Sequence, residues 1–174
     1  LAIVVTAAVA PRVLVVAAER DDLVGGLTEK SDRFAQTLVE SGTFGFMSGR
    51  PSAYTQPLYG FLLSGVYWVG GRSWLTIALA QIALAAVTAV LVYAIGSHIA
   101  SRRVGVVAAV LSTLHPYLVW HDVHVNREVL DGTLAAALTL TALIAAERRS
   151  YRLAGATGVL CGLAILGNSR LLLL

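Results

Sequence analysis

Long runs of apolar residues constrain this chain more than any other feature of its sequence. Five runs stand out, covering residues 1–18, 74–99, 104–120, 129–146 and 153–167. A helix needs about 20 apolar residues to cross the hydrocarbon core of a bilayer, and most of these runs approach or exceed that length. Hydrophobic residues make up 57% of the chain and charged residues only 13%, so a chain this short cannot bury all of its apolar surface internally. We therefore expect an integral membrane protein that crosses the bilayer several times, with a soluble helical bundle as the alternative.

The runs predict helices. Backbone groups in lipid must be hydrogen-bonded within the protein, and barrel strands would alternate apolar and polar residues, which these runs do not do. The expected fold class is all-α, a bundle of about five transmembrane helices within one domain, residues 1–174, whose fifth span extends to residue 170. The chain begins with an apolar run that lacks Met and stops inside a run of leucines, so we expect it to be the N-terminal part of a longer protein, cut at both ends.

Basic residues in the short loops predict the orientation. Arg102 and Arg103 join the second and third spans, and a second arginine cluster at 148–152 joins the fourth and fifth. The positive-inside rule places both turns in the cytoplasm. The loops 19–73 and 121–128 then lie outside, and they carry nearly all the carboxylates. Any carboxylate chemistry is therefore expected outside the cytoplasm.

The long outer loop holds a further apolar segment, residues 58–69, which is too short to span comfortably. Its Tyr and Trp side chains suit the headgroup layer, so we expect a helix lying along the membrane surface. Pro57 at its start and Gly70 at its end are typical helix boundaries.

Ionisable residues gather where the third and fourth spans reach the outer face. Such groups near membrane depth are costly and usually face a cavity or a partner, although they can simply solvate a loop. His121, Asp122 and His124 could bind a metal ion, but their spacing matches no diagnostic pattern. Arg12, inside the first run, either snorkels to the interface or holds a lipid phosphate. The need for a metal stays open.

Several motifs follow one another in an order that resembles a known family. The first span ends shortly after an arginine and is followed by an acid, A-x-x-L-x-x-x-G-x-F from Ala35, P-S-A-Y-x-x-P-x-Y from Pro51, an apolar helix with Gln81 near its start, R-R-x-G from Arg102, and E-x-L from Glu128. This order resembles the GT-C glycosyltransferases, in particular the bacterial branch of family 39 that includes dolichyl-phosphate-mannose protein mannosyltransferases and aminoarabinose transferases. The resemblance covers nearly the whole chain.

The resemblance implies a membrane glycosyltransferase that moves a sugar from a polyprenyl-phosphate donor to an acceptor hydroxyl, with an Asp of the first outer loop as general base. Asp32 is the candidate base. The family Asp usually lies farther ahead of the A-x-x-L pair, so Asp21 and Asp22 remain alternatives. Glu128 matches the family's acidic position, and Arg127 beside it could hold the donor phosphate together with Arg12.

The resemblance also implies a bacterial plasma membrane protein whose site faces outside, with a protein, lipid or glycan as acceptor. A divalent cation is the one cofactor considered. The alternatives are a transporter or permease subunit, although no internal repeat is evident, and a noncatalytic scaffold. Nucleic acid is not an expected partner, because the net charge of +3 is small and spread over several loops. The sequence does not identify the sugar, the acceptor or the oligomeric state.

Overall fold

Helices form most of the computed structural model, which describes residues 1–19 and 29–170. In chain order the helices are α1 (Ala2–Glu19), α2 (Lys30–Ser41), α3 (Pro57–Gly70), α4 (Trp74–Ile99), α5 (Arg102–Thr113), α6 (Pro116–His121), α7 (Glu128–Arg148) and α8 (Tyr151–Gly167). Within these ranges the one β-type pairing is an isolated bridge between Met47 and Arg50. The predicted all-α fold class is confirmed.

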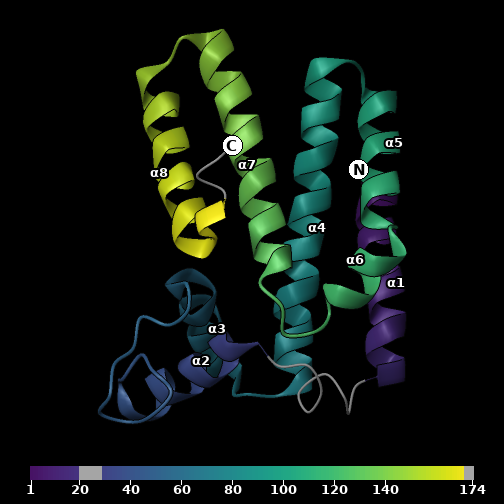
Figure 1. The fold of residues 1–174 in the computed structure, drawn as a ribbon. Coiled ribbons are helices and arrows are strands. Elements are labelled where there is room, and N and C mark those ends of the chain that lie inside the picture. The colour runs from purple at the N-terminus through teal and green to yellow at the C-terminus, as the bar shows by residue number, and fades with distance from the viewer. Residues whose placement is uncertain (20–28, 171–174) are drawn as a thin grey trace.

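The longer helices stand side by side, and α2 and α3 lie together at one end of them (Figure 1). Helix α4 is central: it packs against α1, α5 and α7, while α8 packs against α7. The α4–α5 and α7–α8 turns, which carry the arginines, lie at the end of the bundle opposite α2 and α3 (Figure 1). The chain therefore separates its arginine turns from its long loop by the length of the bundle.

Three of the described helices are long and apolar enough to cross a membrane: α1, α4 and α7. Helix α8 is also apolar but has only 17 residues. The helix expected to follow Pro57 is present as α3, while its position at a membrane surface stays a prediction.

The span expected at residues 104–120 is wrong as a single helix. Helix α5 ends at Thr113, and the short α6 begins at Pro116. Proline has no backbone N–H, and its ring disfavours helical geometry in the preceding residue, here His115 with ψ of 122°. The break separates α5 from α6, and three of the residues that follow it, Leu118, Asp122 and Glu128, line one cavity.

Helix α2 was not predicted by the sequence analysis, which treated its residues as loop. It ends at Ser41 because Gly42 adopts a left-handed conformation, φ 68°, and returns its N–H to the carbonyl of Leu38 at 2.9 Å. The buried Ala35 packs in one cluster with Tyr59, Leu63 and Tyr67 of α3. The buried Phe34 meets the rings of Phe44 and Phe46 in the segment after α2.

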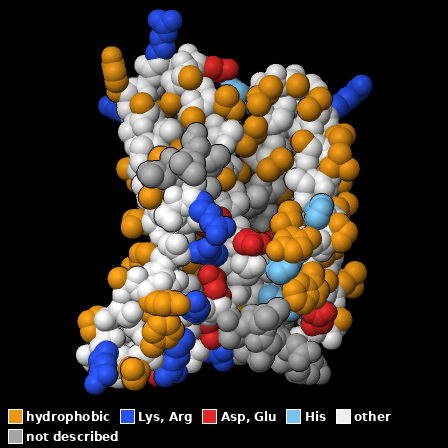
Figure 2. All heavy atoms as spheres, in the orientation of Figure 1, with side chains coloured by type: hydrophobic (Ala, Val, Ile, Leu, Met, Phe, Trp, Pro, Cys, Tyr) orange, Lys and Arg blue, Asp and Glu red, His pale blue; other side chains and the backbone are white. Residues whose placement is uncertain are grey.

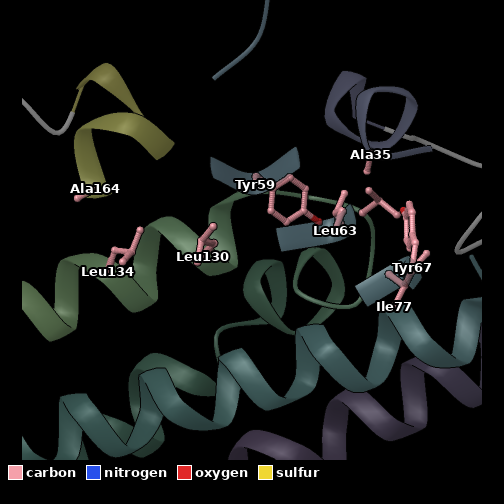
Figure 3. Packing of buried hydrophobic residues seen from close by; sticks show 9 residues of the cluster. Ala35, Tyr59, Leu63, Tyr67, Ile77, Leu130, Leu134 and Ala164 are labelled. Atoms are coloured by element: carbon pink, nitrogen blue, oxygen red, sulfur yellow. The ribbon is translucent and has the colours of Figure 1, made fainter. Parts of the chain in front are cut away.

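A core of buried side chains joins α3 to the rest of the bundle (Figure 3). Tyr59, Leu63 and Tyr67 repeat every four residues along α3, which places them on one face of the helix. This face meets Ile77 of α4 and Leu130 of α7. The start of α7 is thereby fixed beside α2 and α3.

Helices α4 and α5 approach closely through two glycines. A Cβ atom added to Gly96 would lie 2.8 Å from the Cα of Gly105, and one added to Gly105 would lie 2.5 Å from the carbonyl oxygen of Tyr93. Small residues permit such approach in membrane bundles, where packing supplies much of the association energy. The glycines hold α5, and the break at its end, tightly against α4.

Candidate functional site

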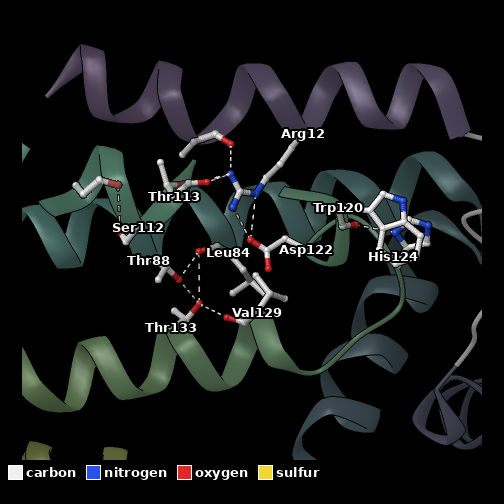
Figure 4. Close-up of polar contacts among 12 residues, drawn as sticks. Arg12, Leu84, Thr88, Ser112, Thr113, Trp120, Asp122, His124, Val129 and Thr133 are labelled. Atoms are coloured by element: carbon white, nitrogen blue, oxygen red, sulfur yellow. Dashed lines mark hydrogen bonds and ion pairs between the residues drawn. The ribbon is translucent and has the colours of Figure 1, made fainter. Parts of the chain in front are cut away.

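The guanidinium of Arg12 lies inside the bundle, where it joins α1 to the segment around the helix break (Figure 4). Its Nε and Nη2 donate to Oδ2 of Asp122 at 3.1 and 2.6 Å. Its Nη1 donates to the carbonyl of Ala8 at 2.7 Å, and to the carbonyl and hydroxyl oxygens of Thr113 at 3.2 and 3.1 Å. Because α5 ends at Thr113, Arg12 satisfies a carbonyl group that the break would otherwise leave without a helical partner.

This placement bears on both roles predicted for Arg12. Only 1% of the residue is exposed, so its side chain does not snorkel to an interface. Burial raises the pKa of Asp122, and the neighbouring Arg12 acts in the opposite direction. The geometry makes Arg12 a support for Asp122 and for the loop that follows, and its binding of a donor phosphate stays a prediction.

The loop 121–128 is fixed from two sides. From α4, the buried Gln81 donates through Nε2 to the backbone carbonyl of His124 and, at 3.3 Å, to that of Asn126. From α1, Glu19 accepts a hydrogen bond from the indole of Trp120 at 3.1 Å and lies 3.3 Å from Nε2 of His124. The Trp120 and His124 rings stack with centroids 3.9 Å apart, so the loop reaches α7 in one defined course.

The metal site considered for His121, Asp122 and His124 does not form. Asp122 turns to Arg12, and His124 turns to Glu19. The His121 ring packs on that of Tyr117 at 3.9 Å between centroids. Over residues 1–19 and 29–170 no group of three or more His, Cys, Asp or Glu side chains is placed to hold a metal ion.

Asp32, the expected general base, lies in the first turn of α2, where a network of hydrogen bonds surrounds its carboxylate. One oxygen accepts from the hydroxyl of Tyr67 at 2.5 Å and from Nε of Arg72 at 3.0 Å. The other accepts from Nη2 of Arg72 and from Nε2 of Gln36, both at 2.8 Å. The residue is 4% exposed. Burial and the Asp32 carboxylate raise the pKa of Tyr67 well above its usual value, which keeps the phenol as a donor.

The sequence analysis did not single out Tyr67, Arg72 or Gln36. The spacing of Tyr59, Leu63 and Tyr67 could have shown that Tyr67 faces inward, but the partner of its hydroxyl comes from a separate helix. Asp21 and Asp22, the alternative bases, lie outside the described residues.

Arg127, at the start of α7, is the centre of a second polar cluster. Its backbone N–H donates to Oε2 of Glu29 at 3.1 Å, and its Nη1 donates to Oε1 of Gln56 at 2.5 Å. Its Nε lies 3.8 Å from Glu29 and 4.0 Å from Asp131. About a quarter of its side chain, 26%, is exposed, and its Nη2 has no hydrogen-bond partner in the described part of the chain. Part of this guanidinium is thus available to an anion.

Two members of this cluster, Glu29 and Gln56, were missed by sequence reasoning. Burial raises the pKa of Glu29, while the charge and the backbone N–H of Arg127 lower it. Glu29 immediately precedes α2, and Gln56 occupies an unspecified position of the P-S-A-Y-x-x-P-x-Y motif, so neither position carried a recognisable signal.

Glu128 differs from Asp32 in being exposed. Among the described residues, the side-chain group that donates a hydrogen bond to its carboxylate is the hydroxyl of Tyr117, 3.4 Å from Oε2. Glu128 lines a cavity of about 110 Å³ between α1, α4, α5 and α7, whose wall also includes Arg12 and Asp122. On the face shown in Figure 2, acidic and basic side chains lie together along the middle and lower part, with His side chains beside them. The structure therefore brings Arg127 and Glu128 to an accessible position and leaves Asp32 enclosed.

Comparison with known proteins identifies the family. The family model described as dolichyl-phosphate-mannose-protein mannosyltransferase matches residues 50–174. The matched part contains Gln56, the helix break, Arg127 and Glu128, and it excludes Arg12 and Asp32. No curated protein and no solved structure gives a significant match. With more than half of its length matched, the chain belongs to the dolichyl-phosphate-mannose-protein mannosyltransferase family, a family of membrane glycosyltransferases.

Proposed function

We propose that this chain carries the donor-binding part of a membrane glycosyltransferase that transfers a sugar from a polyprenyl-phosphate donor to an acceptor hydroxyl. The observation that carries the proposal is the pairing of Arg127 and Glu128 at the start of α7. A partly exposed guanidinium and an exposed carboxylate come from two consecutive residues at the start of one helix. Glycosyl transfer needs a cation at the phosphate of the donor and a base at the hydroxyl of the acceptor.

In this proposal Arg127 binds the phosphate of the donor. A planar guanidinium donates two parallel hydrogen bonds to phosphate oxygens, which Lys cannot do. Gln56 accepts one hydrogen bond from Nη1, and Glu29 lies 3.8 Å from Nε. Nη2 and the second N–H of Nη1 remain as the pair of donors for the phosphate. The nearby carboxylates would repel a dianion, but the donor is a phosphodiester with a single negative charge.

Glu128 acts as the general base. The acceptor hydroxyl attacks the anomeric carbon of the sugar, and its proton passes to the Glu128 carboxylate. The bond between that carbon and the phosphate oxygen breaks, and the polyprenyl phosphate leaves with the bonding electron pair. Arg127 stabilises the negative charge that develops on the phosphate, and a positioned base contributes about 10²–10⁴-fold to such a step.

Asp32 is proposed as the alternative base. Its carboxylate would have to exchange Tyr67 or Arg72 for the acceptor hydroxyl before it could accept a proton. In the present geometry it holds α2 against α3, and through them it supports Gln56. Asp21 and Asp22 remain predictions.

The orientation belongs to the same proposal. Residues 1–174 form part of one GT-C domain in a bacterial plasma membrane, with the arginine turns in the cytoplasm and the Arg127 end outside. What supports it is that both arginine turns lie at one end of the bundle (Figure 1).

The test uses the full-length protein in lipid nanodiscs with radiolabelled polyprenyl-phosphate mannose as the probe donor. We expect the protein to bind the lipid and to release polyprenyl phosphate on addition of membrane and protein acceptors. Absence of both binding and release across several sugar-loaded donors would rule out this function.

A further inference from the structure

A second pocket lies in the outer loop, away from the cavity beside Glu128. It has a volume of about 390 Å³, within the range of about 300–1,000 Å³ typical of small-molecule pockets. Its walls include Phe44 and the segment 52–57, which leads into α3. Neither the family match nor the proposed chemistry assigns any task to it.

The aromatic walls of the pocket are held in place by their neighbours. Phe44 stacks on Phe61 at 4.8 Å between ring centroids and meets Phe34 edge-on at the same distance. Tyr54 packs against Phe46 at 5.4 Å, and Lys30 both donates to its hydroxyl at 3.1 Å and lies 4.5 Å from its ring centroid. The pocket thus presents aromatic surfaces whose orientation is already set.

Polar groups without protein partners complete the lining. The hydroxyls of Ser52 and Thr55 make no hydrogen bond to any described residue. Gln56 offers Oε1 to Arg127, and because arginine can only donate, this contact fixes the orientation of the amide. Its NH2 group therefore remains as a donor with no partner among the described residues.

We propose that this pocket binds a pyranose ring. The apolar face of a sugar packs on aromatic rings, while its hydroxyls need short, uncharged donors and acceptors such as those of Ser52, Thr55 and Gln56. No Lys or Arg lines the pocket within the described residues, so it does not suit a phosphate group. The ring could come from the lipid-linked donor or from a glycan acceptor. The contact of Gln56 with Arg127, the proposed phosphate-binding residue, favours the donor sugar, and this assignment rests on the proposed function.

The experiment compares two lipids on the full-length protein in nanodiscs: polyprenyl phosphate and polyprenyl-phosphate mannose. Tyr54→Leu and Thr55→Val should each weaken binding of the mannosylated lipid by about 2- to 10-fold, the value of one aromatic or hydrogen-bond contact. Binding of the sugar-free lipid should not change. Tyr151→Leu and Thr139→Val, at exposed positions of α8 and α7, are the matched controls and should alter neither lipid.

Two further measurements complete the test. If the variants leave donor affinity unchanged but raise the KM for a glycan acceptor, the pocket binds the sugar of the acceptor. Saturation-transfer NMR with methyl α-D-mannopyranoside reports on the pocket without any lipid, so a signal lost in Tyr54→Leu would support the pocket even if no donor lipid binds and the proposed function fails. The inference is overturned if the variants change none of the three readouts, or if they weaken both lipids equally.

Discussion

Arg12 and Asp122, which are 110 positions apart in the sequence, form a buried ion pair with 2.6 Å between Nη2 and Oδ2. The pair ties the first helix to the loop 121–128, which ends at Arg127 and Glu128. Gln81 and the stacked rings of Trp120 and His124 support the same loop. The position of the candidate site therefore depends on a contact that lies inside the bundle.

Breaking this pair should destabilise the protein strongly. Arg12→Gln leaves the Asp122 carboxylate buried without its cation, and loss of one member of a buried pair typically costs about 3–5 kcal/mol. Thermal unfolding in detergent should show a large fall in Tm, while Arg103→Gln, at an exposed position in the first turn of α5, should have little effect. Equal Tm values for the two variants would show that the pair does not support the fold.

Substitutions of Arg127 and Glu128 should affect different steps of the reaction. Arg127→Gln removes the phosphate contact, so it should weaken donor binding. Glu128→Gln keeps the size of the side chain but not the proton acceptor, so turnover should fall by about 10²–10⁴-fold with donor binding retained. Arg149→Gln and Glu147→Gln, at the opposite end of the bundle, are the controls. Normal turnover in Glu128→Gln would remove this residue from the role of base.

Asp32 should behave as a structural residue. Tyr67→Phe removes one hydrogen bond to its carboxylate and should lower stability by about 2 kcal/mol, because hydrogen bonds to charged groups contribute more than neutral ones. Asp32→Asn should lower Tm as well, with activity falling only as the folded fraction falls. A stable Asp32→Asn protein with turnover reduced at least 100-fold would instead make Asp32 the base.

Glu29 should make stability depend on pH. Burial raises its pKa above the ordinary value of 4.5, so the folded protein holds this proton more tightly than the unfolded chain does. The stabilisation is complete below pH 4.5 and is lost as pH rises through the folded pKa. Tm measured from pH 4 upward should therefore decline more for the wild type than for Glu29→Gln. Parallel Tm curves for the two proteins would contradict the raised pKa.

The orientation can be measured by thiol labelling in intact cells. In a background without other cysteines, a cysteine at Ser48 should react with an impermeant reagent, whereas one at Ser101 should be protected until the membrane is opened. Both positions are exposed in the structure, so access to the reagent depends on the side of the membrane. The reverse labelling pattern would place the Arg127 end in the cytoplasm.

The sequence by itself determined the helical class and the position of α4, because continuous apolar runs leave a chain in lipid no other way to pair its backbone. It also marked Pro57 as the start of α3, since proline fits the first turn of a helix. The same rule read at Pro116 would have predicted the break after α5, but the apolar residues on both sides of it concealed the boundary.

The partners of the charged residues were decided by the tertiary structure. Asp32 and Glu128 are both carboxylates in predicted outer loops, and nothing local distinguishes a base from a structural acceptor. Only the packing of α2 on α3 brings Tyr67 and Arg72 to Asp32 and encloses it. Likewise, Glu29 meets Arg127 across 98 positions. Local patterns determine helices because backbone hydrogen bonds join near neighbours, whereas the burial and pairing of a charge depend on which distant segments the fold brings together.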